Sequence, residues 1–489
     1  MIHGSLNLFI IFSVLLISIL KLFLPPFNLE WFFLDLANFF NQRSIVLDLK
    51  MFKSLQLNTS FYSLIISQLK VENFLEHAYL ARLLNLLSLP FLFYSINIII
   101  NYYKKKIFHK NNLKHFSLSL YIIFTPIVFL LVGKAFPDYL SFVLIVCSIA
   151  LYIKNYFISF TLLIVLSAIL KPIALYISPI IIAISYLNSQ SLFEKKFFLS
   201  IFLATFFAIA YIYKIDKFIV SEEQISYINV SLLSVFSNYL VYVSYLSVLL
   251  LFIVPYKFYE FFKKKEAVLF FIYSGLSILL LIICRTTYGE MSYGFLSYVI
   301  KGEYTGSFIL FMTFLFYIII SSEVIRSKKK YEKYFFLSIN ISIFILAAFV
   351  ERPSQRYLLY IYPFFFLFIF YYFSLGKIKK ILIVNIFCFF IINLFQFLYF
   401  KSFSNVAVKI YNDLSKQKII NETNPLDIFH INGYKFNSSA EFEKKNTYRY
   451  IVKYCKKNTD DKNQISVYNI KLINLTIKQI CILKINDIS

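Results

Sequence analysis

The chain has 489 residues, of which 60% are hydrophobic and only 15% are charged. Soluble domains average about 45–50% apolar and about 25% charged residues, so the composition excludes a soluble enzyme, a disordered chain and a fibrous protein. The apolar runs are continuous rather than alternating, which also excludes a membrane β-barrel. The class that remains is an all-α, multi-pass membrane protein.

The charge is strongly one-sided, with 49 Lys and Arg against 25 Asp and Glu, a net charge of +24. In a soluble protein this excess would suggest a nucleic-acid partner. Here the lysines cluster between apolar runs, which is typical of the cytoplasmic loops of a membrane protein. We therefore expect a lipid bilayer as partner and no nucleic acid.

Thirteen apolar runs are candidates for membrane spans. The first contains Lys21 and is followed by Pro25-Pro26 without a small-residue cleavage site, so we interpret it as a retained helix rather than a signal peptide. In chain order the runs are roughly 6–24, 84–101, 116–133, 138–153, 157–170, 173–187, 197–213, 231–254, 267–283, 307–322, 334–350, 357–374 and 381–399. Only Lys171-Pro172 separates the fifth run from the sixth, and one long bent span is the alternative there.

Charge gives an orientation. With the N-terminus inside and the spans alternating, the Lys runs 104–106, 263–265 and 328–330 all fall inside, as the positive-inside rule requires. Merging the fifth and sixth spans would move the later runs outside, so two helices are preferred. We expect a protein of the cytoplasmic (inner) membrane whose N-terminus is inside and whose C-terminal tail is outside.

Two parts of the chain lie outside the predicted spans: a long first outside loop at 25–83 and an extracytoplasmic tail at 401–489. The loop belongs to the transmembrane domain, residues 1–400, and the tail is a small α/β unit. Alternating apolar residues predict strands at 464–472 and 476–485. Cys455 and Cys481 both lie in this tail, where a disulfide is permitted if the compartment is oxidising; two free thiols are the alternative.

Ionisable residues lie near the span ends on the predicted outside face. Because a charge at membrane depth costs free energy, we interpret these residues together as a candidate site. They are Glu30, Asp35, Asp48, Lys134, Asp138, Lys171, Arg285, Glu290, Glu351, Arg352 and Arg356. Basic groups there suit a lipid phosphate or pyrophosphate, and a nearby carboxylate suits a general base. Each also has a structural interpretation: Asp138 as a helix N-cap, Lys134 and Lys171 as snorkelling side chains. No Cys or His spacing indicates a metal site, and no cofactor is indicated; a divalent metal ion stays an open alternative.

Several short motifs occur in a recognisable order. They are Asn-Thr-Ser-Phe-Tyr-Ser-Leu-Ile-Ile-Ser at 58–67, Ala-Arg-Leu-Leu at 81–84, Phe-Pro-Asp-Tyr-Leu at 136–140, Lys171-Pro172 with Ser178-Pro179, and Arg-Pro-Ser-Gln-Arg-Tyr at 352–357 with Tyr362-Pro363. With the topology, these resemble the GT-C superfamily of integral-membrane glycosyltransferases, especially bacterial relatives of the dolichyl-phosphate-mannose–protein mannosyltransferases. The resemblance covers about residues 1–400 and implies a GT-C-like bundle.

The resemblance implies a hexosyltransferase or mannosyltransferase that moves a sugar from a polyprenyl-phosphate donor to a lipid, glycan or protein acceptor at the outer membrane face. It implies Asp35 or Glu30 as the catalytic base, and Arg352, Arg356 and Lys171 as ligands of the donor phosphate. Lys134 and Asp138 would line the same cavity. The chain departs from the family in having Asn-Thr-Ser where His-Pro-Pro is usual, and the register of the acid is ambiguous: Glu30 fits one alignment and Asp35 another.

Two other functions remain open at this point. An O-antigen polymerase or ligase would use lipid-pyrophosphate glycans, but such proteins carry their large outside loop late in the chain. A polytopic transporter or flippase would usually show two similar halves and helices broken by Gly or Pro. The chain has only 9 Gly and no visible half-repeat, which disfavours the transporter.

Overall fold

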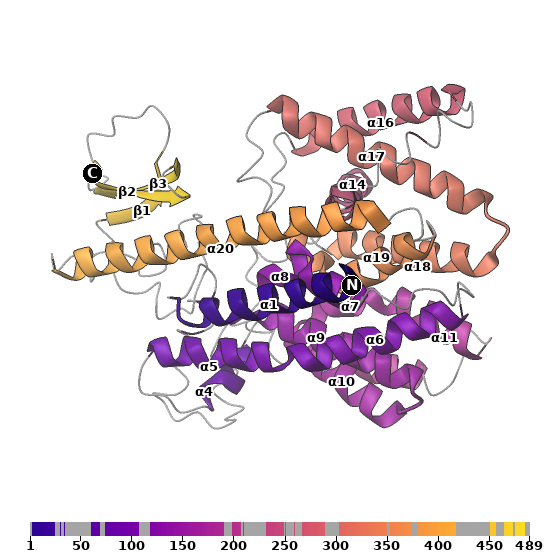
Figure 1. The fold of residues 1–489 in the computed structure, drawn as a ribbon, viewed down its shortest axis with the longest axis horizontal. Helices are drawn as coiled ribbons and strands as arrows, with labels where there is room; N and C mark the ends of the chain where they lie inside the picture. The colour runs from indigo at the N-terminus through magenta and orange to yellow at the C-terminus, as the bar shows by residue number, and fades with distance from the viewer. Residues whose placement is uncertain are drawn as a thin grey trace.

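The computed structural model describes most of the helical region and part of the tail (Figure 1). The described residues are 2–24, 30, 34, 60–68, 74–106, 118–189, 198–206, 209, 231–248, 250, 259, 267–288, 303–349, 353–372, 379–416, 450–455, 464–472 and 475–484. Most of them are helical, and the three strands all lie near the C-terminus.

Helices of very different length build the bundle. They are α1 (Ile2–Leu22), α4 (Ser60–Ser67), α5 (Phe74–Leu87), α6 (Leu89–Lys106), α7 (Leu118–Phe124), α8 (Pro126–Leu131), α9 (Pro137–Ile153), α10 (Phe157–Leu170), α11 (Ser178–Ser189), α14 (Leu232–Val248), α16 (Ala267–Tyr288), α17 (Glu303–Arg326), α18 (Lys330–Phe349), α19 (Tyr362–Tyr372) and α20 (Lys379–Lys416), with the 3-10 helices η1 (Pro172–Ile177) and η4 (Gln355–Tyr360).

Four helical stretches in the described part are long and apolar enough to cross a membrane. They are Ala78–Lys104, Gly306–Arg326, Lys330–Phe349 and Val384–Leu414. Shorter apolar helices accompany them: Asn7–Leu22, Pro137–Ile153, Phe157–Leu170, Ile173–Leu187, Leu232–Val248 and Val268–Cys284. The expected all-α membrane architecture is thus confirmed, while the number of thirteen spans stays a prediction.

The third predicted span is broken in its middle. Pro126 cannot donate a backbone hydrogen bond, so the helix stops at Phe124 and restarts at Pro126. Inside a bilayer the carbonyls freed by such a break need other donors. The hydroxyl of Thr125 donates to the carbonyl oxygen of Ile122 (2.6 Å), and Asn393 of α20 donates to that of Phe124 (2.8 Å).

The chain reverses at Lys171-Pro172, as the two-helix interpretation requires. Ser141, near the start of α9, hydrogen-bonds Ser167 near the end of α10 (2.7 Å), so these helices are antiparallel. Tyr152, near the end of α9, donates to Ser185 near the end of α11 (2.6 Å), so α11 runs parallel to α9. Helix α10 therefore ends before η1, and α11 runs back in the opposite direction to α10. This excludes one long bent span over the fifth and sixth predicted runs.

The two ends of the bundle have different contents. Rings near the ends of α6 and α11 contact rings near the start of α18: Tyr103 lies 5.0 Å from Phe335, and Tyr186 lies 5.8 Å from Tyr334. These contacts place the end of α6 and the start of α18, which are both rich in Lys, at the same end of the helical bundle. The sheet, α4 and the first turns of α5 lie at the other (Figure 1). Which end faces the cytoplasm stays a prediction.

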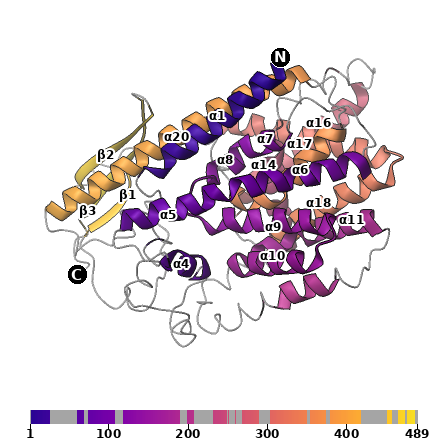
Figure 2. The same ribbon diagram turned by 60° about the horizontal axis from the view of Figure 1, so that its bottom comes forward.

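The tail is carried by the last helix rather than by a separate linker. Helix α20 has 38 residues, about 57 Å of helix, which exceeds a hydrocarbon core of about 30 Å. It continues to Lys416 without a break at residue 400, and its first part lies beside α1 (Figure 2), where Phe9 contacts Phe390. Its second part presents Phe403, Ala407 and Ile410 to the sheet.

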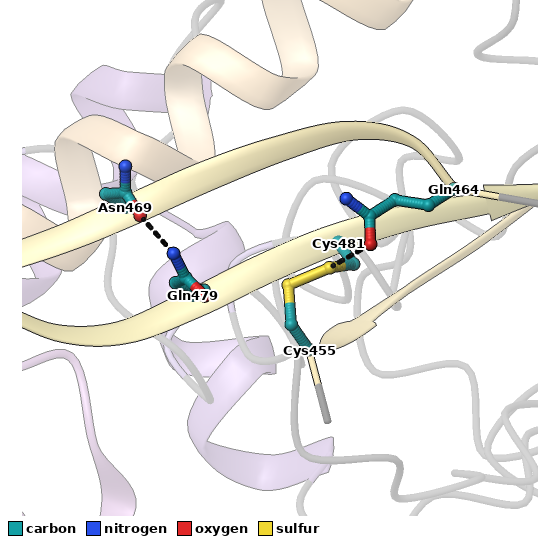
Figure 3. Close-up of a disulfide and its surroundings, with 5 residues drawn as sticks. All are labelled: Cys455, Gln464, Asn469, Gln479 and Cys481. Carbon is teal, nitrogen blue, oxygen red and sulfur yellow. Dashed lines mark hydrogen bonds between the residues drawn. A yellow bond between two sulfur atoms is a disulfide. The ribbon is translucent and has the colours of Figure 1, made fainter. Parts of the chain in front are cut away.

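The sheet has three antiparallel strands in the order β1 (Tyr450–Tyr454), β3 (Leu475–Lys484), β2 (Gln464–Leu472). Strands β2 and β3 confirm the two predicted from alternation, and β1 was not predicted. Cys455 and Cys481 form a disulfide that ties the residue after β1 to β3 (Figure 3). Of the two alternatives for these cysteines, the structure therefore has the disulfide, as an extracytoplasmic tail would permit.

Candidate functional site

The candidate site is built around the connection between α8 and α9, residues 132–136. Lys21, from α1, donates from Nζ to the carbonyl oxygens of Phe129 (2.9 Å) and Val132 (3.2 Å), where α8 ends. A cation suits this place because the last carbonyls of a helix carry partial negative charge. The chain then turns at Gly133, whose φ of 73° lies in the left-handed region that favours glycine.

A second side chain fixes the same connection from α5. Asn85 donates from Nδ2 to the carbonyl oxygen of Lys134, and also to that of Phe136 at 3.4 Å. The ring of Phe136 belongs to a small apolar cluster with Tyr62 of α4 and Leu170 of α10. The first long loop, the end of α10 and the α8–α9 connection therefore meet at one place.

Glu30 is the first predicted site residue that the structure describes, and it is fully buried. Arg82 of α5 binds its carboxylate with both sides of the guanidinium, Nε to Oε1 at 3.0 Å and a terminal nitrogen to Oε2 at 2.6 Å. The amide of Ala135 also donates to Oε1, at 2.7 Å. Arg82 further donates to the carbonyl oxygens of Lys21 (2.8 Å) and Leu24. This bidentate pair anchors the first loop to α5.

The electrostatics of this pair follow from its contacts. Burial alone would raise the pKa of Glu30, but the guanidinium of Arg82, the Lys134 cation and the Ala135 amide together hold it below its ordinary value. Burial lowers the pKa of Lys134 to about 8, although the Glu30 carboxylate opposes this shift. Lys134 is therefore poised to lose its proton slightly above neutral pH.

The contacts of Glu30 indicate an anchor rather than a general base. A general base needs an oxygen that faces the acceptor hydroxyl and a pKa near the working pH. Both carboxylate oxygens of Glu30 instead accept hydrogen bonds from protein donors, and its pKa is lowered. Asp35, the other candidate for the base, lies outside the described residues.

Helix α20 contributes an aromatic ring to the same place. The ring centre of Phe400 lies 5.4 Å from the guanidinium carbon of Arg82 and 5.3 Å from Nζ of Lys134. Both distances are within the range of cation–π attraction. The site thus lies where α20 leaves the bundle, between Tyr399 and Phe403, which pack in the cluster that contains the sheet.

A second cluster forms on the other side of Pro137. Asp138 lies at the second position of α9 and is fully buried, and Nζ of Lys171 lies 3.6 Å from its Oδ1. Lys171 is 17% exposed, so the pair reaches the surface on the lysine side. The expected N-cap role of Asp138 is not found: the N-cap is Phe136, and no side chain caps this helix.

Arg356 joins this cluster through Tyr357. Its guanidinium donates to the Tyr357 hydroxyl at 2.9 Å and stacks on the ring, 4.9 Å from the ring centre. Nζ of Lys171 lies 5.9 Å from the centre of the same ring. Tyr176, in η1, donates to the Tyr357 carbonyl oxygen and so ties η1 to η4. Two of the predicted phosphate ligands therefore flank one tyrosine.

The structure brings five of the seven predicted site residues to this end of the bundle, in two clusters. Glu30 and Lys134 belong to the first, and Asp138, Lys171 and Arg356 to the second. Asp35 and Arg352 lie outside the described residues. Since Ala135 contacts Glu30 and lies three residues before Asp138, the α8–α9 connection joins the clusters.

Several participants were not predicted as site residues. Arg82 stands in the Ala-Arg-Leu-Leu motif, and Lys21 is the lone cation of the first apolar run, so both had a visible signal. Tyr357 is the last residue of the Arg-Pro-Ser-Gln-Arg-Tyr motif, next to Arg356. Within the described residues, no three His, Cys, Asp or Glu side chains are grouped to hold a metal ion.

A cavity of about 350 Å³ lies elsewhere, between α14, α16 and α17. Its lining is almost entirely apolar and includes Leu240, Val243, Phe314 and Ile318. None of the predicted site residues lines it. It has the character of a surface groove between membrane helices, and the chemistry of the candidate site does not depend on it.

Comparisons of the chain with protein-family models, with curated proteins and with solved structures give no match. The residues of the site and the resemblance of the sequence motifs are therefore the observations that bear on function.

Proposed function

We propose that the protein is a membrane glycosyltransferase of the GT-C type, which transfers a sugar from a polyprenyl-phosphate donor to an acceptor at the outer face of the cytoplasmic membrane. In this proposal Lys171 and Arg356, with Arg352, bind the donor phosphate, and Asp35 takes the proton of the acceptor. Lys134 lines the same site. The lysine-rich end of the bundle faces the cytoplasm, and the disulfide-bonded tail lies outside.

The observation that carries the proposal is the second cluster. Lys171, Arg356 and the buried Asp138 come from three segments far apart in the chain and meet at the end of the bundle opposite the Lys-rich helix ends. Cations that are partly buried bind phosphate more strongly than fully exposed ones, because water screens them less. Their place at the ends of apolar helices is suited to the phosphate of a lipid whose chain lies in the bilayer.

The reaction chemistry needs these groups. The acceptor oxygen attacks the anomeric carbon, the bond from that carbon to the phosphate oxygen breaks, and the electron pair leaves with polyprenyl phosphate. A phosphodiester with one negative charge thereby becomes a monoester with about two at neutral pH. Cations at the phosphate stabilise this developing charge more than the ground state, which lowers the barrier. The acceptor proton passes to the first-loop acid.

Purified protein in nanodiscs tests the proposal. Polyprenyl-phosphate mannose and polyprenyl-phosphate glucose are supplied with a lipid extract and cell-envelope glycan as acceptors, and the release of polyprenyl phosphate is measured. We expect release from at least one donor, with a loss of at least 100-fold in Lys171→Met. The matched control is Lys329→Met, which removes an exposed cation at the opposite end of the bundle.

Other outcomes would identify the rival functions. Consumption of a polyprenyl-pyrophosphate glycan, with no turnover of the monophosphate donors, would contradict the proposal in favour of a polymerase or ligase. Uptake of a labelled solute into proteoliposomes without any product would contradict it in favour of a transporter.

A further inference from the structure

The carboxylate of Asp138 is buried without hydrogen bonds. Its side chain is fully buried, and neither Oδ1 nor Oδ2 accepts a hydrogen bond from any described residue. Buried polar atoms are nearly always hydrogen-bonded, and an unsatisfied charged one is costly. A buried carboxylate without hydrogen-bond donors indicates a place where a donor from outside the described protein binds.

The neighbours of Asp138 do not meet this need. Nζ of Lys171 lies 3.6 Å from Oδ1, beyond the 2.7–2.9 Å of a charge-assisted hydrogen bond. The hydroxyl of Tyr360 is directed to the backbone carbonyl oxygen of Asp138 (3.4 Å), not to the carboxylate. The hydroxyl of Tyr357 accepts a hydrogen bond from Arg356. The carboxylate thus lies next to the groups of the proposed phosphate site and retains its capacity to accept hydrogen bonds.

We propose that Asp138 recognises the sugar of the donor by accepting hydrogen bonds from its hydroxyl groups. This inference rests on the proposed function. Sugar hydroxyls are donors without charge, and a carboxylate can accept several of them. The sugar of a polyprenyl-phosphate donor is attached directly to the phosphate, so a phosphate held by Lys171 and Arg356 places the sugar beside Asp138. Asp138 is then a specificity-determining residue on the donor side, separate from the acceptor base.

The test compares two phosphodiesters of equal charge. One probe is polyprenyl-phosphate mannose, with the glucose form measured in parallel, and the other is methyl polyprenyl phosphate, which has no sugar hydroxyls. Binding is measured to full-length protein in nanodiscs. We expect wild type to bind a sugar diester at least tenfold more tightly than the methyl diester. In Asp138→Asn this preference falls at least tenfold, while the affinity for the methyl diester stays equal or rises, because a negative charge is removed beside Lys171.

Matched variants support the comparison. Glu332→Gln also removes one buried negative charge that lies near a lysine, but at the opposite end of the bundle, and leaves both affinities unchanged. We expect Asp138→Ala to lose the same preference as Asp138→Asn. Thermal unfolding of each variant checks that the variant is folded.

Four outcomes would overturn the inference. An equal loss for both probes in Asp138→Asn would mean that Asp138 only positions Lys171. An unchanged preference would mean that the sugar does not contact it. If wild type binds neither diester, the proposed function fails together with the inference; if wild type binds both equally, the inference alone fails.

Discussion

Two buried acids lie on either side of one short connection, and they differ in every polar contact. Glu30 is held by both arms of Arg82 and by a backbone amide, whereas Asp138 accepts no hydrogen bond from the described residues and faces Lys171 at 3.6 Å. Both side chains are fully buried. Burial and charge alone therefore do not separate an anchoring acid from a ligand-binding one; the state of the hydrogen bonds does.

The comparison assigns different roles to the two halves of the site. The satisfied pair stabilises the fold, because removing one partner would leave a buried charge alone. The unsatisfied acid contributes little stability and retains its acceptor capacity for a ligand. Substitutions should therefore affect folding on one side of the α8–α9 connection and binding on the other.

The largest effect is expected for Arg82→Met, which leaves Glu30 buried without its main counter-charge. We expect a loss of about 3–5 kcal/mol of stability. Thermal or denaturant unfolding in nanodiscs measures it. Adding Glu30→Gln to the same variant should recover part of the loss. A loss below about 1 kcal/mol would show that Glu30 is not anchored as described.

The disulfide should stabilise the tail by a similar amount. Cys455 and Cys481 are 26 residues apart, and closing a loop of that size contributes about 3–4 kcal/mol in the chain-entropy description. We expect Cys481→Ser to make the tail sensitive to protease while the helical bundle stays resistant. Cys388→Ser, at a free cysteine, is the control and should leave the tail resistant. An equally resistant tail in both variants would contradict this prediction.

Lys134 gives a pH-dependent effect. Its pKa is lowered to about 8 from an ordinary value of 10.5, so between these values the unfolded chain binds more protons than the folded one. Stability should therefore rise with pH across this window, by up to about 3 kcal/mol at 1.36 kcal/mol per pKa unit. Unfolding measured from pH 7 to 10 should show this rise in wild type and a smaller one in Lys134→Met. Identical slopes of stability against pH in the two proteins would mean that a group other than Lys134 titrates.

The smallest effect on stability is expected for Asp138→Asn. Because its carboxylate makes no hydrogen bond with the described residues, we expect a change below about 1 kcal/mol, or a slight gain, since a charge is removed from a buried position. The free energy of unfolding of Asp138→Asn, compared with wild type and with Glu332→Gln, measures this change. A loss as large as that of Arg82→Met would mean that Asp138 is a structural acid like Glu30.

Local rules predict much of this fold. The reversal at Lys171-Pro172 follows from the missing N–H of proline and from the charge pattern that demands two spans. The strands Gln464–Leu472 and Leu475–Lys484 follow from alternation. The gathering of the Lys-rich helix ends follows from the requirement that charge stays out of the hydrocarbon. Each of these follows from a pattern that can be seen in the sequence without knowing which helices pack together.

The partners within the site could not be predicted in this way. Glu30 and Arg82 are 52 residues apart, and their contact depends on how the first loop packs against α5. Lys21 looked like an isolated charge in a span, and only the packing of α1 against α8 shows that it binds the end of that helix. The residues of β1 lack a clear alternation of apolar and polar side chains. They form a strand because they pair with the edge of β3.

The most direct test of the central claim is sugar transfer by Arg356→Lys in nanodiscs, with Arg326→Lys as the matched control. Lysine keeps the charge but loses the planar group that stacks on Tyr357 and can bind phosphate with two donors. The account predicts at least tenfold slower release of polyprenyl phosphate from a polyprenyl-phosphate sugar, with unfolding unchanged and the control at the wild-type rate. Equal transfer rates in all three proteins would contradict the assignment of this cluster as the phosphate site.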